Sequence, residues 1–136
     1  MSFSDAETAI SAAFSTMATA QTLTVMRDNA PEPASITAKW CRIRFSSDPA
    51  TLLSMGGTGG NKYRTPGQFV AEVYVPAKQG AETLRDIADA MRDAFIGQRI
   101  ASPDIQFISV AAGPHQEVGA WSRRDFTVRF RFDEVR

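Results

Sequence analysis

The sequence is poor in the side chains that form disulfides and bind transition metals. Among its 136 residues there is one cysteine, Cys41, and one histidine, His115. An internal disulfide needs two cysteines, and a structural zinc site usually needs four thiolate or imidazole ligands. We therefore expect neither a disulfide nor a metal site.

A net charge and long apolar runs are also absent. Lysine and arginine together number 15, and aspartate and glutamate together number 15. Proteins that bind nucleic acid generally carry a basic excess, so this balance argues against that class, although local basic patches remain compatible with it. No stretch approaches the ~20 apolar residues of a membrane helix. The first residues, MSFSDAETAISAAF, lack the basic start and apolar run of a signal peptide. We expect no membrane partner, and folding in a cytoplasm.

The composition that is present is that of an ordinary globular protein, with 43% hydrophobic and 22% charged residues. A chain of this length can bury roughly two thirds of its unfolded surface. We expect a single domain over residues 1–136.

Two segments have apolar residues at helical spacing. In the first, between Phe3 and Met17, Ser4 and Glu7 form a capping-box pattern that predicts a helix start at Asp5. The second, AETLRDIADAMRDAF (81–95), has an apolar stripe and a charged opposite side, and Gly97 predicts its end.

Other segments alternate between apolar and polar residues and predict strands. They lie near 23–26, 39–45, 51–55, 67–76, 104–113 and 124–134, whereas GPHQEVG (113–119) is expected to be a turn or loop. This order of elements predicts an α+β fold: an antiparallel β-sheet with two α-helices packed on one face and a projecting glycine-rich β-hairpin.

The hairpin sequence GGTGGNKYRTPG (56–67) has the residue types of a phosphate-binding loop. Such a loop needs glycine where Asn61 stands and a hydroxyl residue where Tyr63 stands, and it leads from a strand into a helix rather than into a strand. We therefore expect no nucleotide and no other cofactor. Two interpretations stay open: an inert turn, or a mobile limb in which Asn61, Lys62, Tyr63 and Arg64 contact a partner.

No combination of residues indicates catalysis, and we expect that the protein is not an enzyme. His115 lies near Glu117 in a predicted loop without a nucleophile beside it, and the alternation places Cys41 in the core. The aspartates of the second predicted helix fit a solvated face better than a metal cluster.

The alternation also places arginines on the sheet face opposite the core. They are Arg42, Arg44, Arg129 and Arg131, accompanied by Glu72, Asp125 and Tyr74. Three interpretations stay open: a face exposed to water, a subunit interface with cross-chain ion pairs, or a surface that passes near nucleic acid.

Residues 64–95, RTPGQFVAEVYVPAKQGAETLRDIADAMRDAF, resemble the tail terminator (tail completion) proteins of long-tailed phages and gene transfer agents, including the lambda minor tail protein U type. That family has an Arg-x-x-Gly turn, a strand of the type G-x-F-x-x-x-V-x-V-P, a short linker with glycine and a helix ending in phenylalanine. The matching positions are Arg64, Gly67, Gln68 to Pro76, Gly80, and Leu84 to Phe95. Asn29, Pro31, Pro33 and the segment WCRIRF extend the resemblance over most of the chain.

The resemblance implies a structural virion protein without enzymatic activity. Family members form a hexameric ring that caps the tail tube, ends tube polymerisation and forms the tail side of the head–tail junction. The implied partners are copies of the chain itself, the tail tube protein and a head-closure or connector protein, with DNA passing through the lumen without specific binding. The implied location is the virion tail at the head junction, after assembly in the cytoplasm of a bacterial host. The alternatives are another head–tail connector or tail tube protein, or a small-molecule-binding α/β domain or enzyme.

Overall fold

The computed structural model describes residues 3–26, 39–47, 49–55, 60–78, 80–100 and 104–135. Its elements, in chain order, are α1 (Phe3–Ala20), β1 (Thr24–Met26), β2 (Trp40–Ser47), β3 (Thr51–Met55), β4 (Asn61–Pro76), α2 (Gly80–Phe95), β5 (Arg99–Ile100), β6 (Asp104–Ala112), β7 (Gln116–Val118) and β8 (Trp121–Val135).

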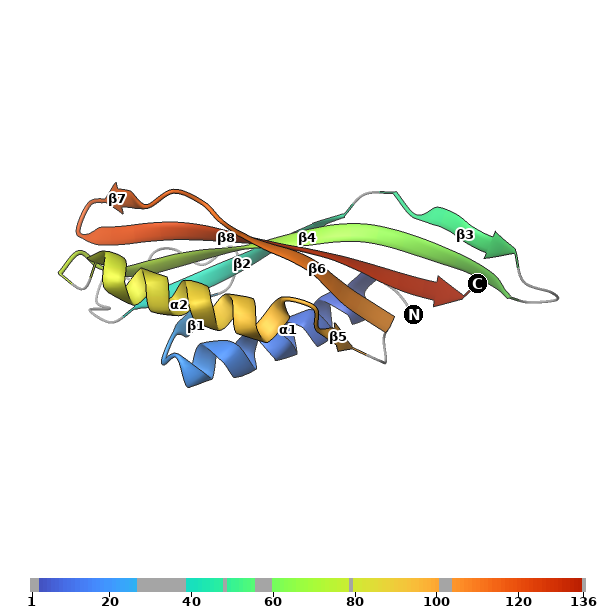
Figure 1. The fold of residues 1–136 in the computed structure, drawn as a ribbon, viewed down its shortest axis with the longest axis horizontal. Coiled ribbons are helices and arrows are strands. Elements are labelled where there is room, and N and C mark those ends of the chain that lie inside the picture. The colour runs from blue at the N-terminus through green and yellow to red at the C-terminus, as the bar shows by residue number, and fades with distance from the viewer. Residues whose placement is uncertain are drawn as a thin grey trace.

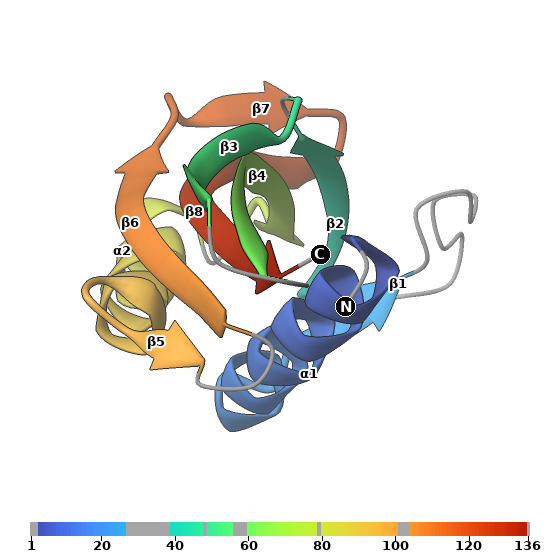
Figure 2. The same cartoon turned by 90° about the vertical axis from the view of Figure 1, so that its right-hand side faces the viewer.

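The strands form one twisted sheet that curls about the long axis of the molecule (Figures 1 and 2). The strand order is β1-β2-β4-β8-β6-β5, while β3 pairs with β4 and β7 pairs with β8. The two longest strands, β4 and β8, are antiparallel and pair from Lys62↔Val135 to Pro76↔Trp121. They are the central ladder to which every other part of the fold is attached.

The predicted fold class is wrong, because the sheet is mixed and the fold is mostly β. Strand β1 runs parallel to β2, with Thr24 opposite Trp40 and Met26 opposite Arg42. Residues 27–39 connect these two strands, and a parallel pair needs a connection of about this length, whereas an antiparallel pair can be joined by a tight turn. A connection of this length permits parallel pairing but does not require it, so the sequence left the direction of β1 open.

Both helices lie against the same face of the sheet (Figure 1). The hydrophobic core lies between this layer of helices and the sheet. Phe69 of β4 links the layers, because its ring meets Phe14 of α1 at 6.0 Å and Phe95 of α2 at 5.3 Å, both edge to face. The inward residues predicted for the last strand are confirmed as buried: Phe126, Val128, Phe130 and Phe132. Each buried aromatic or aliphatic side chain contributes about 1.5–3 kcal/mol, so this face determines the fold.

Several local predictions differ from the structure. Helix α1 begins at Phe3, so Ser4 lies inside the helix, where its carbonyl accepts a hydrogen bond from Thr8 Oγ1 at 2.9 Å. The predicted capping box is therefore wrong. The segment 113–119 contains β7, and β5 was not predicted. The predicted stop of α2 is confirmed, since Gly97 adopts a φ of 67°.

Strand β3, residues 61–64 of β4 and residues 133–135 of β8 form an arm that extends beyond the helices (Figure 1). Met55 pairs with Asn61 across its end, and the glycine-rich turn 56–59 lies outside the described residues. No helix in the described part of the chain is long and apolar enough to cross a membrane.

Candidate functional site

The face of the sheet turned away from the helices, called here the outer face, carries the predicted arginines. Strand β4 lies between β2 and β8, and the register places Arg42, Glu72 and Asp125 side by side on this face. The alternation of the strands predicted the face correctly. The strand order, which decides which charges meet, was not readable from the sequence.

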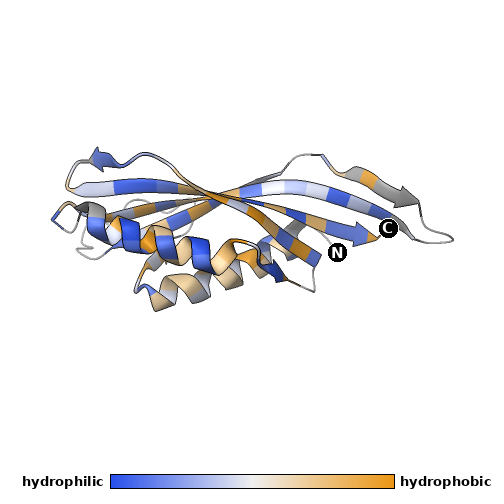
Figure 3. Ribbon diagram, in the orientation of Figure 1, coloured by the Kyte–Doolittle hydropathy of each residue, from blue (hydrophilic) through white to orange (hydrophobic). Residues whose placement is uncertain are grey.

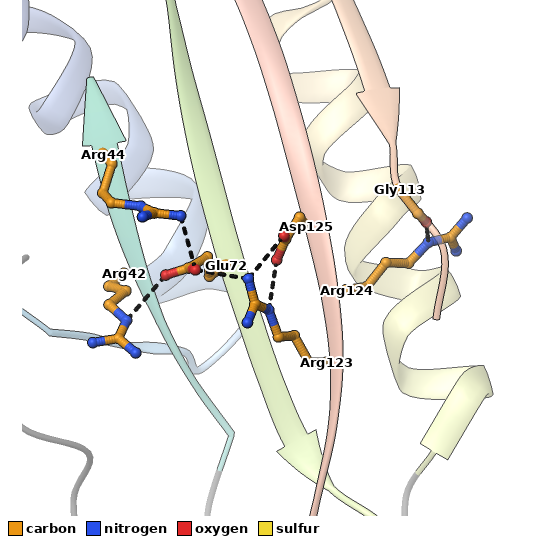
Figure 4. Close-up of polar contacts among 7 residues, drawn as sticks. All are labelled: Arg42, Arg44, Glu72, Gly113, Arg123, Arg124 and Asp125. Atoms are coloured by element: carbon orange, nitrogen blue, oxygen red, sulfur yellow. Dashed lines mark hydrogen bonds and ion pairs between the residues drawn. The ribbon is translucent and has the colours of Figure 1, made fainter. Parts of the chain in front are cut away.

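Glu72 is the centre of an ion cluster on the outer face (Figure 4). Its carboxylate is 3.1 Å from Arg42 Nε, 3.0 Å from Arg44 Nη2 and 2.8 Å from Arg123 Nη2. The side chain of Glu72 is only 8% exposed, and burying a carboxylate costs desolvation energy. The three guanidinium groups around it offset this cost.

Arg123 extends this cluster to a second carboxylate. It donates two parallel hydrogen bonds to Asp125, from Nε to Oδ1 and from Nη2 to Oδ2, both at 2.9 Å. The cluster thus contains three arginines and two carboxylates, and it retains a positive excess. Sequence reasoning missed Arg123, although the alternation of β8 continues to this residue.

Aromatic rings support the same cluster. Trp40 and Tyr74 stack with centroids 4.2 Å apart, and Trp121 meets Trp40 edge to face at 6.1 Å. The Arg42 guanidinium lies 5.4 Å from the Trp40 centroid, and that of Arg123 lies 5.6 Å from the Tyr74 centroid. These cation–π contacts explain why Trp40 and Tyr74 are buried although they face outward.

Both of these arginines are permanent charges. The pKa of Arg42 is raised chiefly by a hydrogen bond with the Tyr74 side chain. The pKa of Arg123 is raised chiefly by its hydrogen bonds with Asp125. The charges of these two guanidinium groups therefore do not change over the physiological pH range.

A second group of charges lies on the outer face of the arm. Asp133 accepts two hydrogen bonds from Arg64, at 2.9 and 3.1 Å, and lies 3.7 Å from Lys62 Nζ. Arg64, predicted to contact a partner, is thus already held within the chain. Tyr63 is half-buried on the opposite face of the arm, beside Leu52 and Glu134 in the register, and Asn61 lies opposite Met55.

Arg129 and Arg131 lie on the outer face between these two groups. Arg131 donates a hydrogen bond to Gln106, while Arg129 is exposed and makes no ion pair with any other described residue. Arg129 borders a shallow hollow of about 400 Å³, and exposed Ile108 also lines it. The four predicted arginines therefore share one face but belong to separate groups, and their role in an interface stays a prediction.

The two residues considered for catalysis lie elsewhere. His115 Nε2 is 3.2 Å from Glu117 Oε1 near the exposed β7 hairpin, and Glu117 also accepts a hydrogen bond from Ser122. Cys41 is buried, as predicted, and burial raises the pKa of its thiol to about 12. Within the described ranges, no three potential metal ligands come together.

No protein-family model matches the chain, and comparison with curated proteins gives no match. The fold is similar to a solved structure of a protein without a descriptive name, with a TM-score of 0.70 and 16% identity over 97% of this chain and 96% of that one. A chain from the virion of a native gene transfer agent (GTA) particle aligns with a TM-score of 0.46 and 20% identity, over 87% of this chain and 84% of that one. The first similarity shows a shared fold, and the second is too weak to carry an argument.

Proposed function

We propose that the protein is a structural component of a virion tail, namely a tail terminator of the type found in long-tailed phages and gene transfer agents. In this proposal it assembles as a homohexameric ring at the head-proximal end of the tail. The ring caps the tube, ends tube polymerisation and joins the tail to a head-closure or connector protein. Its action is steric and involves no bond-making chemistry.

The observation that carries the proposal is the position in the fold of residues 64–95, the block that resembles tail terminator proteins. Arg64 joins the β4 and β8 parts of the arm through Asp133, and Gly67 lies under the Phe130 ring at the root of the arm. Pro76 ends β4, and α2 begins at Gly80. The resembling block is therefore the unit that joins the arm to the helix-covered body, which gives a structural reason for its pattern.

The arm supplies the proposed contact with the tube or with a neighbouring subunit. Lys62 and Tyr63 are partly exposed on its two faces, and Asn61 marks the start of β4. Among the described residues, the edge strand β3 pairs only with β4, and along its other side another chain can add backbone hydrogen bonds. DNA passes through the lumen without specific binding, consistent with the neutral charge of the whole chain.

The proposal is tested by adding the purified protein to polymerising tube subunits of the same particle and measuring tube lengths by electron microscopy. We expect tubes to stop growing, with the added protein at one end. The Lys62→Glu variant in the arm should cap less well, whereas Lys78→Glu in the turn before α2 serves as the matched control. Tubes that lengthen unchanged would contradict the proposal. Long hollow fibres formed by the protein alone would instead identify it as a tube protein.

A further inference from the structure

The structure separates opposite charges onto two sides of the molecule, although the whole chain is neutral. The outer face of the sheet carries eight basic side chains and four carboxylates, as its register shows. The basic residues are Arg42, Arg44, Lys62, Arg64, Arg99, Arg123, Arg129 and Arg131, and the acidic ones are Glu72, Asp104, Asp125 and Asp133.

The helical side has the opposite sign. Its two helices carry six carboxylates, Asp5, Glu7, Glu82, Asp86, Asp89 and Asp93, and only two arginines, Arg85 and Arg92. Figure 3 shows hydrophilic residues recurring along α2, on the side away from the buried stripe. The outer face thus carries a charge of +4 and the two helices carry −4, while the other five basic and five acidic residues of the chain balance each other.

The two sides differ in how many of their charged side chains form ion pairs within the chain. The four carboxylates of the outer face all pair with arginines of that face. None of the charged side chains of α2 makes an ion pair within the part of the chain that the structure describes, and neither does Arg129. Arg129 and the α2 aspartates are thus available to a partner of the opposite sign.

Each side also has an exposed isoleucine beside its available charge. Ile108, 56% exposed, shares the shallow hollow of the outer face with Arg129. Ile96, 43% exposed, lines a hollow of about 440 Å³ at the end of α2 together with Asp89, Arg92 and Asp93. Apolar side chains next to complementary charges are what two docking surfaces require, because burial supplies affinity and charge supplies orientation.

We infer that copies of this chain associate front to back, with the outer face of one copy around Arg129 and Ile108 docking on the α2 face of the next copy around Asp89 and Ile96. Pairing like faces in a symmetric dimer would bring charges of the same sign together, which is costly at an interface. Front-to-back contacts close into a ring or continue as a filament. The inference rests on the proposed ring only for closure, and it assigns a contact between copies that does not involve the arm.

The experiment is a charge exchange measured by analytical ultracentrifugation at low ionic strength. Arg129→Glu sets an acidic side chain against Asp89 of the next copy, and Asp89→Arg sets a basic side chain against Arg129, so each variant alone should associate roughly tenfold more weakly. An equal mixture of the two variants should associate as the wild type does, because every contact then joins opposite charges. The double variant should also recover. Lys78→Glu is the control charge reversal outside both faces, and thermal unfolding should show that all variants are folded.

Raised ionic strength should weaken the association of the wild type, because charges at an exposed contact are screened over about 10 Å at 0.1 M salt. A wild-type chain that stays monomeric at about 1 mM overturns the inference. So does a mixture that fails to recover. If Arg129→Glu instead abolishes binding to a short DNA duplex and leaves self-association unchanged, the outer face is a polyanion-binding surface and the inference is wrong.

These outcomes are separate from those of the capping test. Recovery in the mixture without any effect on tube length would uphold the contact and contradict the tail terminator function. Capping that persists unchanged in both single variants would uphold the function and contradict this contact.

Discussion

At the root of the arm, Gly67 of β4 allows the Phe130 ring of β8 and the backbone of β2 to lie close to its Cα atom. A Cβ atom at this position would lie 2.8 Å from Phe130 Cζ and 3.2 Å from the Ser46 carbonyl oxygen. Phe130 is its cross-strand partner and is 1% exposed, with Phe69 and Phe107 nearby, so the ring has little room to move. The absent side chain is what lets the ring cover the backbone.

We therefore predict that Gly67→Ala lowers the free energy of unfolding by about 1–3 kcal/mol, as overpacking of a core does. Urea denaturation measures this change. In the Phe130→Leu background the same substitution should cost clearly less, because the ring that it meets is gone. An equal cost in both backgrounds would show that the contact with the ring is not the cause.

Cys41 gives a second prediction for a single residue. Burial raises the pKa of its thiol from 9.0 to about 12, so the thiol stays protonated in the folded chain. We expect no reaction with an aromatic disulfide reagent at pH 8 until the chain is unfolded in urea. Rapid modification of the folded protein would contradict the burial of this thiol.

The same shift makes stability depend on pH. Below pH 9 the thiol is protonated in both states, and its contribution is fully present. As the pH rises from 9 toward 12, the unfolded chain ionises and the folded chain does not, so stability falls, by at most about 1.4 kcal/mol per pH unit from this group. The Cys41→Ala variant should lose stability less steeply over this range, which isolates the thiol from the lysines and tyrosines.

Among the elements, the arm contains a carboxylate, Asp133, that holds two of its basic side chains. Asp133 is 9% exposed and binds both Arg64 and Lys62. We predict that Asp133→Asn leaves the body intact and loosens the arm, because Arg64 loses its charged partner. Hydrogen exchange should become faster at residues 61–65 and 132–135 and stay unchanged at 69–75 and 126–130.

The matched control is Asp104→Asn, which removes a more exposed pair with Arg99. Exposed pairs contribute about 0–1 kcal/mol, so this variant should change exchange in the arm very little. Faster exchange throughout the sheet in Asp133→Asn would contradict a local role for this carboxylate.

The sequence predicted the elements that show a regular spacing of apolar residues within their own segment. Alternation identified the inward sides of β4 and β8, and helical spacing identified the buried stripe of α2, because these periods depend only on the chain itself. The parallel pairing of β1, the two-residue strand β5 and the β7 hairpin depend on distant partners or are too short to show a period. The sequence therefore predicted segments better than their arrangement in the sheet.

The same limit applies to the outer face. Alternation placed Arg42 and Arg44 on it, but only the position of β4 between β2 and β8 shows that Glu72 binds them together with Arg123. The burial of Glu72 was also unpredictable, because it results from arginines of neighbouring strands that surround the carboxylate. In a strand with alternating polarity, the position of a charged residue predicts which face of the sheet it lies on, but it does not predict how exposed the side chain is.

At the scale of the whole molecule, the chain is elongated, with a twisted sheet whose outer face is basic, an acidic helix side and an arm at one end (Figure 1). The difference between its two sides gives it a front and a back, as a subunit that adds to copies of itself in one direction requires. The arm adds a contact that points away from the helix-covered body. These features together are the basis for proposing an assembly protein.

The central claim is that the protein occupies the end of a tail tube, and its location in purified tails tests this claim most directly. A gold label on the protein should appear in electron micrographs at the head-proximal end of each tail, as a single ring. Label distributed along the tube, or absent from purified tails, would contradict the account.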